Sequence, residues 1–252
     1  MRRIISSDKE WPSQLGMLEV SPSQLFIESN EPDLSALTAK SIAIVGSRNA
    51  TPYGLRVAAD FAAALAEAGY TIISGGAFGV DAAAHRGALS VGGKTVVVLA
   101  GGVDCPYPMA HSNLFTDASR NGALVSEHPA GTPSHKHNFL TRNRIIAGLA
   151  FGTLIVEAAY KSGAIRTALD TMKLLRPVMA IPGPISSPLS AGVNRLIADR
   201  IAELVTSSWE IEEIVGSYGQ SGQLMLGADG MINPCQTQSS QPQIFGQGLS
   251  LS

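Results

Sequence analysis

The segment KHNFLTRNR, residues 136–144, carries the side chains of this sequence that are best suited to contact a ligand. It combines cations, one phenyl ring and one central amide and holds no acidic residue: Lys136, Arg142, Arg144, Phe139 and Asn143. Single-stranded nucleic acid is bound by this combination, because cations contact its phosphates and flat rings stack on its unpaired bases. The segment therefore predicts a site for a single strand, with Asn143 able to hold a backbone group or a base edge.

A solvated basic helix face is the competing interpretation of the same segment. Lysine and arginine often line an exposed helix face without any ligand, and Phe139 would then be a core residue. One cluster leaves both interpretations open, so the decision depends on what the rest of the chain brings beside it.

Two further stretches could hold a phosphate. Gly46-Ser47-Arg48 follows an apolar run, and its glycine, its amides and the charge of Arg48 suit an anion at a helix N-terminus. Ser162-Gly163 joins a helix N-cap to a residue that permits close approach. An ordinary strand-to-helix turn is the alternative at both places, and neither contains the G-x-G-x-x-G dinucleotide fingerprint.

Two carboxylates lie in comparable positions. Asp81 ends the stretch SGGAFGVD, where it could bind a hydroxyl or simply complement a helix N-terminus. Glu157 ends an apolar run; it could pair with Arg142 or Arg144, but we expect it rather to be a structural partner.

The elements that must position these residues alternate between short β-branched runs and longer helical patterns. Strands are predicted at residues 41–46, 71–74, 94–100, 123–127, 153–158, 177–183 and 203–207, with helices between most of them. This order predicts an α/β fold with a doubly wound, mostly parallel sheet, an extended Rossmann-like fold. Ligands of such sheets bind beyond the carboxyl ends of the strands, which is where all the stretches above would meet.

Three regions are expected along the chain. Residues 1–40 are predicted to be an extended lead-in, 41–215 a Rossmann-like DNA-binding domain, and 216–252 a flexible tail rich in Gln, Ser and Gly. The formal net charge of -2 gives no global sign of nucleic acid, so a basic site must be local. Two distant cysteines, no apolar leader and no long apolar run favour a reduced, cytoplasmic protein.

Several motifs resemble, in order, those of the DprA (Smf) family of DNA-processing proteins. They are IVGSR, SGGAFGVD, GGVDCPYP, F-TRNRIIAGL, VEA with SGA, and AIPGP, and they span roughly Trp11 to Val215. The N-terminal helical domain and the C-terminal winged helix that many family members carry are not evident here.

The resemblance implies binding of single-stranded DNA, loading of a RecA-type recombinase in processes such as natural transformation, and a homodimer. It implies no catalytic turnover, no metal and no cofactor. Carried over by motif, the DNA-binding positions are Ser47, Arg48, Lys136, Phe139, Arg142, Asn143 and Arg144, followed by Ser162 and Gly163.

Two other classes of protein compete with this prediction. A nucleotide phosphoribohydrolase of the lysine-decarboxylase-like Rossmann family would place its glutamate near Glu157, but its glycine-rich loop is missing from FGTLIVEA. A pure interaction scaffold would leave residues 136–144 without a role. The apolar positions Leu169, Met172 and Leu175 could form a dimer surface or belong to the core.

Overall fold

One mixed sheet runs through the described part of the chain. The computed structural model describes residues 1–225, with side chains through Ser217, and the rest of the predicted tail, 226–252, lies outside the described residues. The strand order is β1-β2-β6-β5-β4-β3-β7-β8-β9. The strands are β1 (Arg2–Ile5), β2 (Gln24–Ser29), β3 (Ser41–Val45), β4 (Thr71–Ser74), β5 (Thr95–Val98), β6 (Gly122–Ser126), β7 (Thr153–Ile155), β8 (Val178–Ala180) and β9 (Glu203–Leu204).

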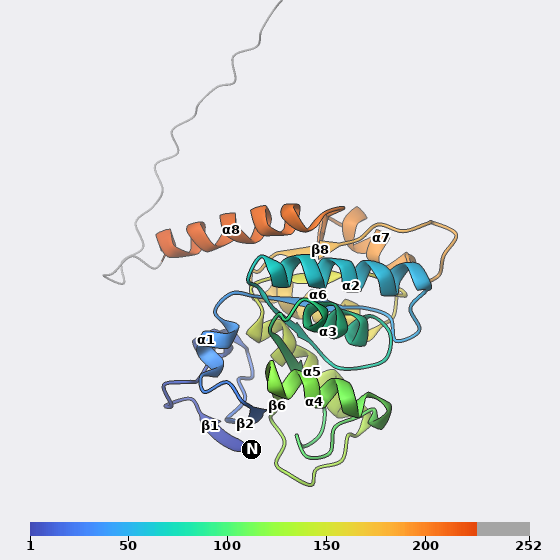
Figure 1. Cartoon of the computed structure of the whole chain (residues 1–252). Helices are drawn as coiled ribbons and strands as arrows, with labels where there is room; N and C mark the ends of the chain where they lie inside the picture. Colours follow the sequence, from blue (N-terminus) through green and yellow to red (C-terminus); the bar gives the residue numbers. More distant parts are fainter. Residues whose placement is uncertain (226–252) are drawn as a thin grey trace, which may run out of the picture.

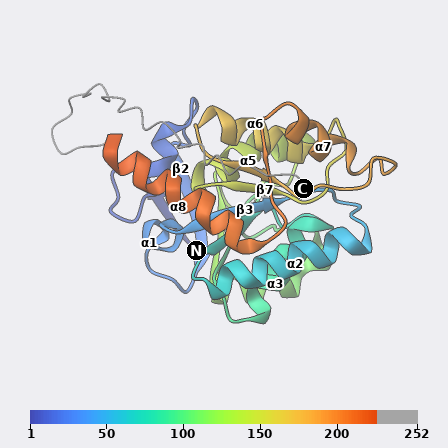
Figure 2. The same cartoon turned by 90° about the horizontal axis from the view of Figure 1, so that it is seen from above.

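Helices cover both faces of this sheet, so the predicted doubly wound fold is confirmed. The α-helices are α1 (Leu34–Thr38), α2 (Pro52–Glu67), α3 (Val80–Ser90), α4 (Ser112–Arg120), α5 (Lys136–Leu149), α6 (Gly163–Lys173), α7 (Ala191–Ala198) and α8 (Ser208–Met225), and short 3₁₀ helices cover Ser13–Met17 and Met109–His111. Figure 2 shows α2 and α3 on one side of the sheet and α5, α6 and α7 on the other. None of the helices in residues 1–225 is long and apolar enough to cross a membrane.

The local signals for two helix starts are confirmed. The Thr51 side chain accepts a hydrogen bond from the Gly54 amide, and Pro52 occupies the first turn of α2. The Ser162 side chain accepts from the Ile165 amide and so caps α6. Both helices therefore begin at the carboxyl edge of the sheet, beside β3 and β7.

The first forty residues differ from the expected irregular lead-in. β2 pairs antiparallel with β1 and with β6, so this segment completes the sheet at one edge (Figure 1). Leu15 and Leu18 pack against Gly148 of α5 and belong to the core on that face. The pattern was missed because these strands are short and are ordered by pairing, β2 with β6 and β1 with β2, rather than by a local signal. The last helix also continues beyond residue 215, through Met225.

His85 lies fully buried between α3 and β5. Its Nδ1 is 2.6 Å from the Thr95 hydroxyl oxygen, and that hydroxyl already donates to the Ile72 carbonyl at 2.8 Å. The imidazole Nδ1–H is therefore the donor, and Nε2 has no partner among the described residues. Burial, together with the nearby Arg142 charge, lowers the pKa of His85 to about 3.

We predict that this histidine makes the fold sensitive to acid. Its pKa is 6.5 when unfolded and about 3 when folded, so its contribution is complete above pH 6.5 and is lost as the pH falls toward 3. Between pH 6.5 and 5 the loss is on the order of 2 kcal/mol. Urea unfolding across this range, comparing the wild type with His85→Leu, measures it. The variant has the shallower pH dependence, whereas replacing the exposed His137 leaves the slope unchanged; equal slopes for His85→Leu and wild type contradict the prediction.

Candidate nucleic-acid interface

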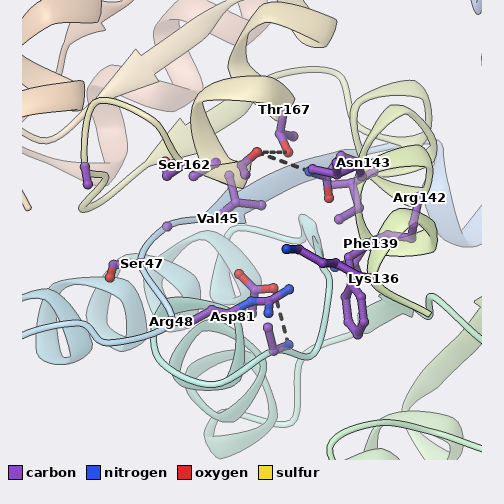
Figure 3. Close-up of a pocket in the computed structure, with 17 residues that line it drawn as sticks. Val45, Ser47, Arg48, Asp81, Lys136, Phe139, Arg142, Asn143, Ser162 and Thr167 are labelled. Carbon is purple, nitrogen blue, oxygen red and sulfur yellow. Dashed lines mark hydrogen bonds between the residues drawn. The ribbon is translucent and has the colours of Figure 1, made fainter. Parts of the chain in front are cut away.

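A pocket of about 330 Å³ lies where the winding of the sheet reverses. From β3 the chain winds outward through β4, β5 and β6 in one direction and through β7, β8 and β9 in the other, and β3 pairs with β7. The carboxyl ends of β3 and β7 therefore leave a crevice between them. Figure 3 shows side chains from the β3 loop, α3, α5 and α6 around it.

The turn after β3 forms one wall of the pocket. A Cβ on Gly46 would lie 2.6 Å from a Val80 methyl group and 2.9 Å from the Glu157 carbonyl, so only glycine fits. The Ser47 amide, predicted to be free for a phosphate, instead donates to the Glu157 carbonyl at 2.6 Å. The turn is thus fixed by β7, and the Arg48 side chain is its main group for an anion.

Arg48 and Lys136 approach the pocket from opposite sides (Figure 3). The Arg48 guanidinium lies over the Phe139 ring, 4.8 Å from its centroid. Lys136 is exposed at the start of α5, and Phe139 is half-buried one turn later. Residues separated by about ninety positions in the sequence therefore meet, as predicted, and the stacking face of Phe139 is covered by a cation in this state.

Arg142 has a different position from the one predicted. It is only 4% exposed, and its Nη1 donates to the carbonyls of Gly75, at 2.7 Å, and of Val98. Burial lowers the pKa of this guanidinium to about 10, and Nε has no partner among the described residues. Arg142 forms part of the pocket wall, but its bonds hold the ends of β4 and β5 rather than reaching into solvent.

Arg144 lies outside the pocket. Its Nη2 donates to Glu127 at 2.6 Å, and it faces residues 17–20 and α6. Successive residues of a helix point about 100° apart, so a helix that buries position 142 cannot also direct 144 to the same pocket. Glu157 does not pair with Arg142 or Arg144 and is instead a structural partner, as expected. The Glu157 carboxylate accepts from the Thr51 amide at 2.9 Å and from the Thr51 hydroxyl at 2.6 Å.

The start of α6 closes the pocket opposite Arg48. Asn143, predicted to hold a ligand, is mostly buried, and its Nδ2 donates to the Gly163 carbonyl at 3.1 Å. Ser162 and Gly163 line the pocket as expected, together with Thr167, which the sequence analysis did not single out. Thr167 lies one helical turn after Gly163, and this spacing is the signal that could have identified it.

Asp81 is the acidic group of the pocket. Burial raises the pKa of its carboxyl, against the lowering effect of the Arg142 charge, and the carboxylate accepts from the Ala77 amide at 3.3 Å. The pocket lining thus carries three cations, Arg48, Lys136 and Arg142, and one carboxylate. Its local charge is positive although that of the whole chain is negative, and this suits an anionic ligand.

Comparison with known proteins identifies the family. The family model of DNA recombination-mediator protein A matches residues 2–216. The chain is 48% identical over 187 residues to a DprA sequence of Mycobacterium tuberculosis, covering 74% of this chain and 48% of the relative. It is 42% identical over 212 residues to Protein Smf of Escherichia coli, covering 83% and 56%. The chain therefore spans about half the length of these relatives.

Comparison with solved structures identifies the same family. The X-ray structure of DprA from Streptococcus pneumoniae superposes with a TM-score of 0.79 at 36% identity, covering 84% of this chain and 73% of that one. A DprA structure from Helicobacter pylori, described for its single-stranded DNA binding mode, superposes with a TM-score of 0.75 at 25% identity, covering 88% and 97%. With the family model matching nearly all described residues, this chain belongs to the DNA recombination-mediator protein A family, DprA/Smf.

Proposed function

We propose that the chain captures single-stranded DNA at the pocket between β3 and β7. The observation that carries this proposal is the meeting of Arg48, Lys136 and Phe139 at one pocket with local positive charge. A phosphate and an adjacent unpaired base need these groups together. The DprA of Helicobacter pylori, whose structure describes a single-stranded DNA binding mode, has the same fold.

Binding proceeds through an exchange of partners at Arg48. The guanidinium covers the Phe139 ring before binding. A phosphate offers Arg48 a full negative charge and charge-assisted hydrogen bonds, which a ring face cannot match. As Arg48 turns toward the phosphate, a base takes its place on Phe139, while Lys136 contacts the backbone. Asn143, Ser162 and Gly163 shape the opposite wall.

The wider role follows from family membership. The chain processes the captured strand and loads a RecA-type recombinase onto it, as in natural transformation, in the cytoplasm and without catalytic turnover. The carboxylate of Glu157, which a ribose-cleaving enzyme would need free, is already bonded to Thr51. The protein acts as a homodimer through the apolar surface at the end of α6 and just after it, where Met172 is 41% exposed and Leu175 82% exposed.

Lys136→Ala tests the phosphate contact. We expect single-stranded DNA to bind about tenfold or more weakly, because a charged hydrogen bond is lost. The slope of log K against log salt falls by about 0.7, the value of one phosphate contact on a single strand. Fluorescence anisotropy over a salt series, with single- and double-stranded oligonucleotides, measures both. Lys9→Ala removes an exposed cation outside the pocket and serves as the control; identical behaviour of the two variants would rule out the proposed contact.

Two further substitutions separate stacking from charge. Phe139→Leu weakens binding roughly 5- to 100-fold through loss of stacking and leaves the salt slope unchanged. Arg144→Gln leaves affinity and slope close to those of the wild type, because Arg144 is paired with Glu127 away from the pocket. The same anisotropy assay reports both results. Strong loss with Arg144→Gln and none with Phe139→Leu would favour a strand path on the other side of α5.

The dimer surface is tested by Leu175→Glu. A charge on this exposed apolar side chain cannot be buried unpaired, so we expect the chain to become monomeric. Light scattering after size exclusion gives the mass, and anisotropy on a short oligonucleotide gives the affinity of the intact pocket. Ile185→Glu is the matched control, since Ile185 is fully exposed on a loop outside α6. A Leu175→Glu protein with the same mass as wild type contradicts this surface.

A further inference from the structure

Large apolar side chains are exposed on the loops that follow β4 and β5. Phe78 is 47% exposed, Tyr107 52% and Met109 83%. Single exposed apolar residues are common on protein surfaces, but a group of them in adjoining loops marks a contact surface. We call Phe78 and Tyr107 the aromatic rim: Tyr107 packs against Phe139 of the pocket lining, and Phe78 directly follows Ala77, which also lines the pocket.

The aromatic rim is continuous with the proposed DNA site. The Tyr107 and Phe139 rings pack edge to face, with centroids 5.9 Å apart and planes at 73°. Phe139 in turn carries the Arg48 guanidinium. One set of contacts therefore leads from the pocket through Phe139 to Tyr107.

Phe78 joins the rim from the other loop. Its neighbour Gly79 approaches the turn after β3 so closely that a Cβ would lie 2.1 Å from the Ser47 carbonyl, and the Val80 amide donates to that carbonyl at 3.1 Å. The Phe78 ring rests against His111, 4.7 Å between centroids, which leaves the rest of its surface open.

The charge around the pocket favours a strand on this side. His135, Lys136 and His137 are exposed at the start of α5 near Phe139, and the Asp104 carboxylate there is held by the Gly131 amide at 2.9 Å. On the opposite side the exposed Tyr53 stands beside the Glu157 carboxylate in a separate pocket. The exposed cation Lys136 therefore places the attraction for a phosphate backbone on the Phe139 side.

We propose that the aromatic rim is a second base-binding subsite, in which Tyr107 and Phe78 each stack a base of the strand beyond the nucleotide held at Phe139. The inference rests on the proposed function. A base inserted between two rings needs about 7 Å of separation, so 5.9 Å excludes insertion between Tyr107 and Phe139. Each ring offers its own face, and the strand turns between them. Stacking on ring faces tolerates any base, so this subsite adds affinity and footprint without sequence preference.

The test compares Tyr107→Leu, Tyr107→Phe and Phe78→Leu with the wild type on oligonucleotides of increasing length, all by anisotropy. With long oligonucleotides we expect Tyr107→Leu and Phe78→Leu to bind roughly 5- to 100-fold more weakly. With oligonucleotides too short to pass Phe139, the two leucine variants bind as tightly as the wild type. Tyr107→Phe keeps the ring and binds as tightly as the wild type at every length. The salt slope of all variants is that of the wild type. The Phe78 ring packs on His111, whereas Tyr107 packs on Phe139, so the Phe78 variant also guards against an indirect effect on the Phe139 ring.

Photocrosslinking gives an independent readout. Oligonucleotides with 5-iodouracil at successive positions are irradiated on the wild-type protein, and crosslinked peptides containing Tyr107 or Phe78 are expected at positions next to the one that reaches Phe139. Tyr53→Leu is the matched control and keeps full affinity. Crosslinks at Tyr53 instead, or full affinity of both rim variants at every length, overturn the inference. If Lys136→Ala and Phe139→Leu also bind normally, the proposed function itself fails; if only the rim variants do, the second subsite alone fails.

Discussion

The buried guanidinium of Arg142 holds the carboxyl edge of the sheet together at the pocket. It reaches from α5 to the ends of β4 and β5. There it donates to two carbonyls, that of Gly75 directly after β4 and that of Val98 at the end of β5. Desolvation of a cation costs several kcal/mol and is offset here by these bonds and by the Asp81 charge. Removing the guanidinium would leave both buried carbonyls without this donor and would take away the charge that favours the Asp81 carboxylate, which costs more than the bonds themselves stabilise.

The rest of the site depends on this placement. With Arg142 fixed, the helical repeat directs Asn143 toward Gly163 and Phe139 toward Arg48, while Arg144 turns to Glu127. Glu157, just after β7, fixes the other wall in a similar way. Its carboxylate accepts from the Thr51 amide and hydroxyl, and its backbone carbonyl accepts from the Ser47 amide. Two buried charged side chains, Arg142 and Glu157, thus hold the loops, and the exposed Arg48 and Lys136 are left for the ligand.

This arrangement would allow an acidic protein to hold a polyanion such as the single strand proposed above. The formal charge of the chain is -2, but the pocket collects three cations and one carboxylate. Since phosphate contacts supply affinity and aromatic faces tolerate any base, such a surface suits a protein that must accept strands of every sequence. The exposed rings beyond Phe139 extend the same chemistry outward from the pocket.

Much of the fold could be predicted from the sequence, because continuous apolar runs such as SIAIV and TVVV are typical of buried parallel strands and do not depend on distant partners. The meeting of Arg48, Lys136 and Phe139 followed from the same order of elements, since parallel strands present their carboxyl ends at one edge. The strands in the first forty residues were not predicted, because β2 is ordered by antiparallel pairing with β6, about one hundred residues away, and β1 by pairing with β2.

The sequence by itself determined which residue types gather at the sheet edge, because the order of strands and helices along the chain and the spacing of the motifs can be read directly from it. Only the tertiary structure decided what each side chain does there. Three cations of residues 136–144 look equivalent in sequence, yet one is buried against carbonyls, one is paired with Glu127, and Lys136 alone is exposed at the pocket. The reason is physical: the face of α5 that packs on the sheet sets the direction of every other side chain of the helix, and that face is chosen by contacts with β4, β5 and α6 that no local pattern contains.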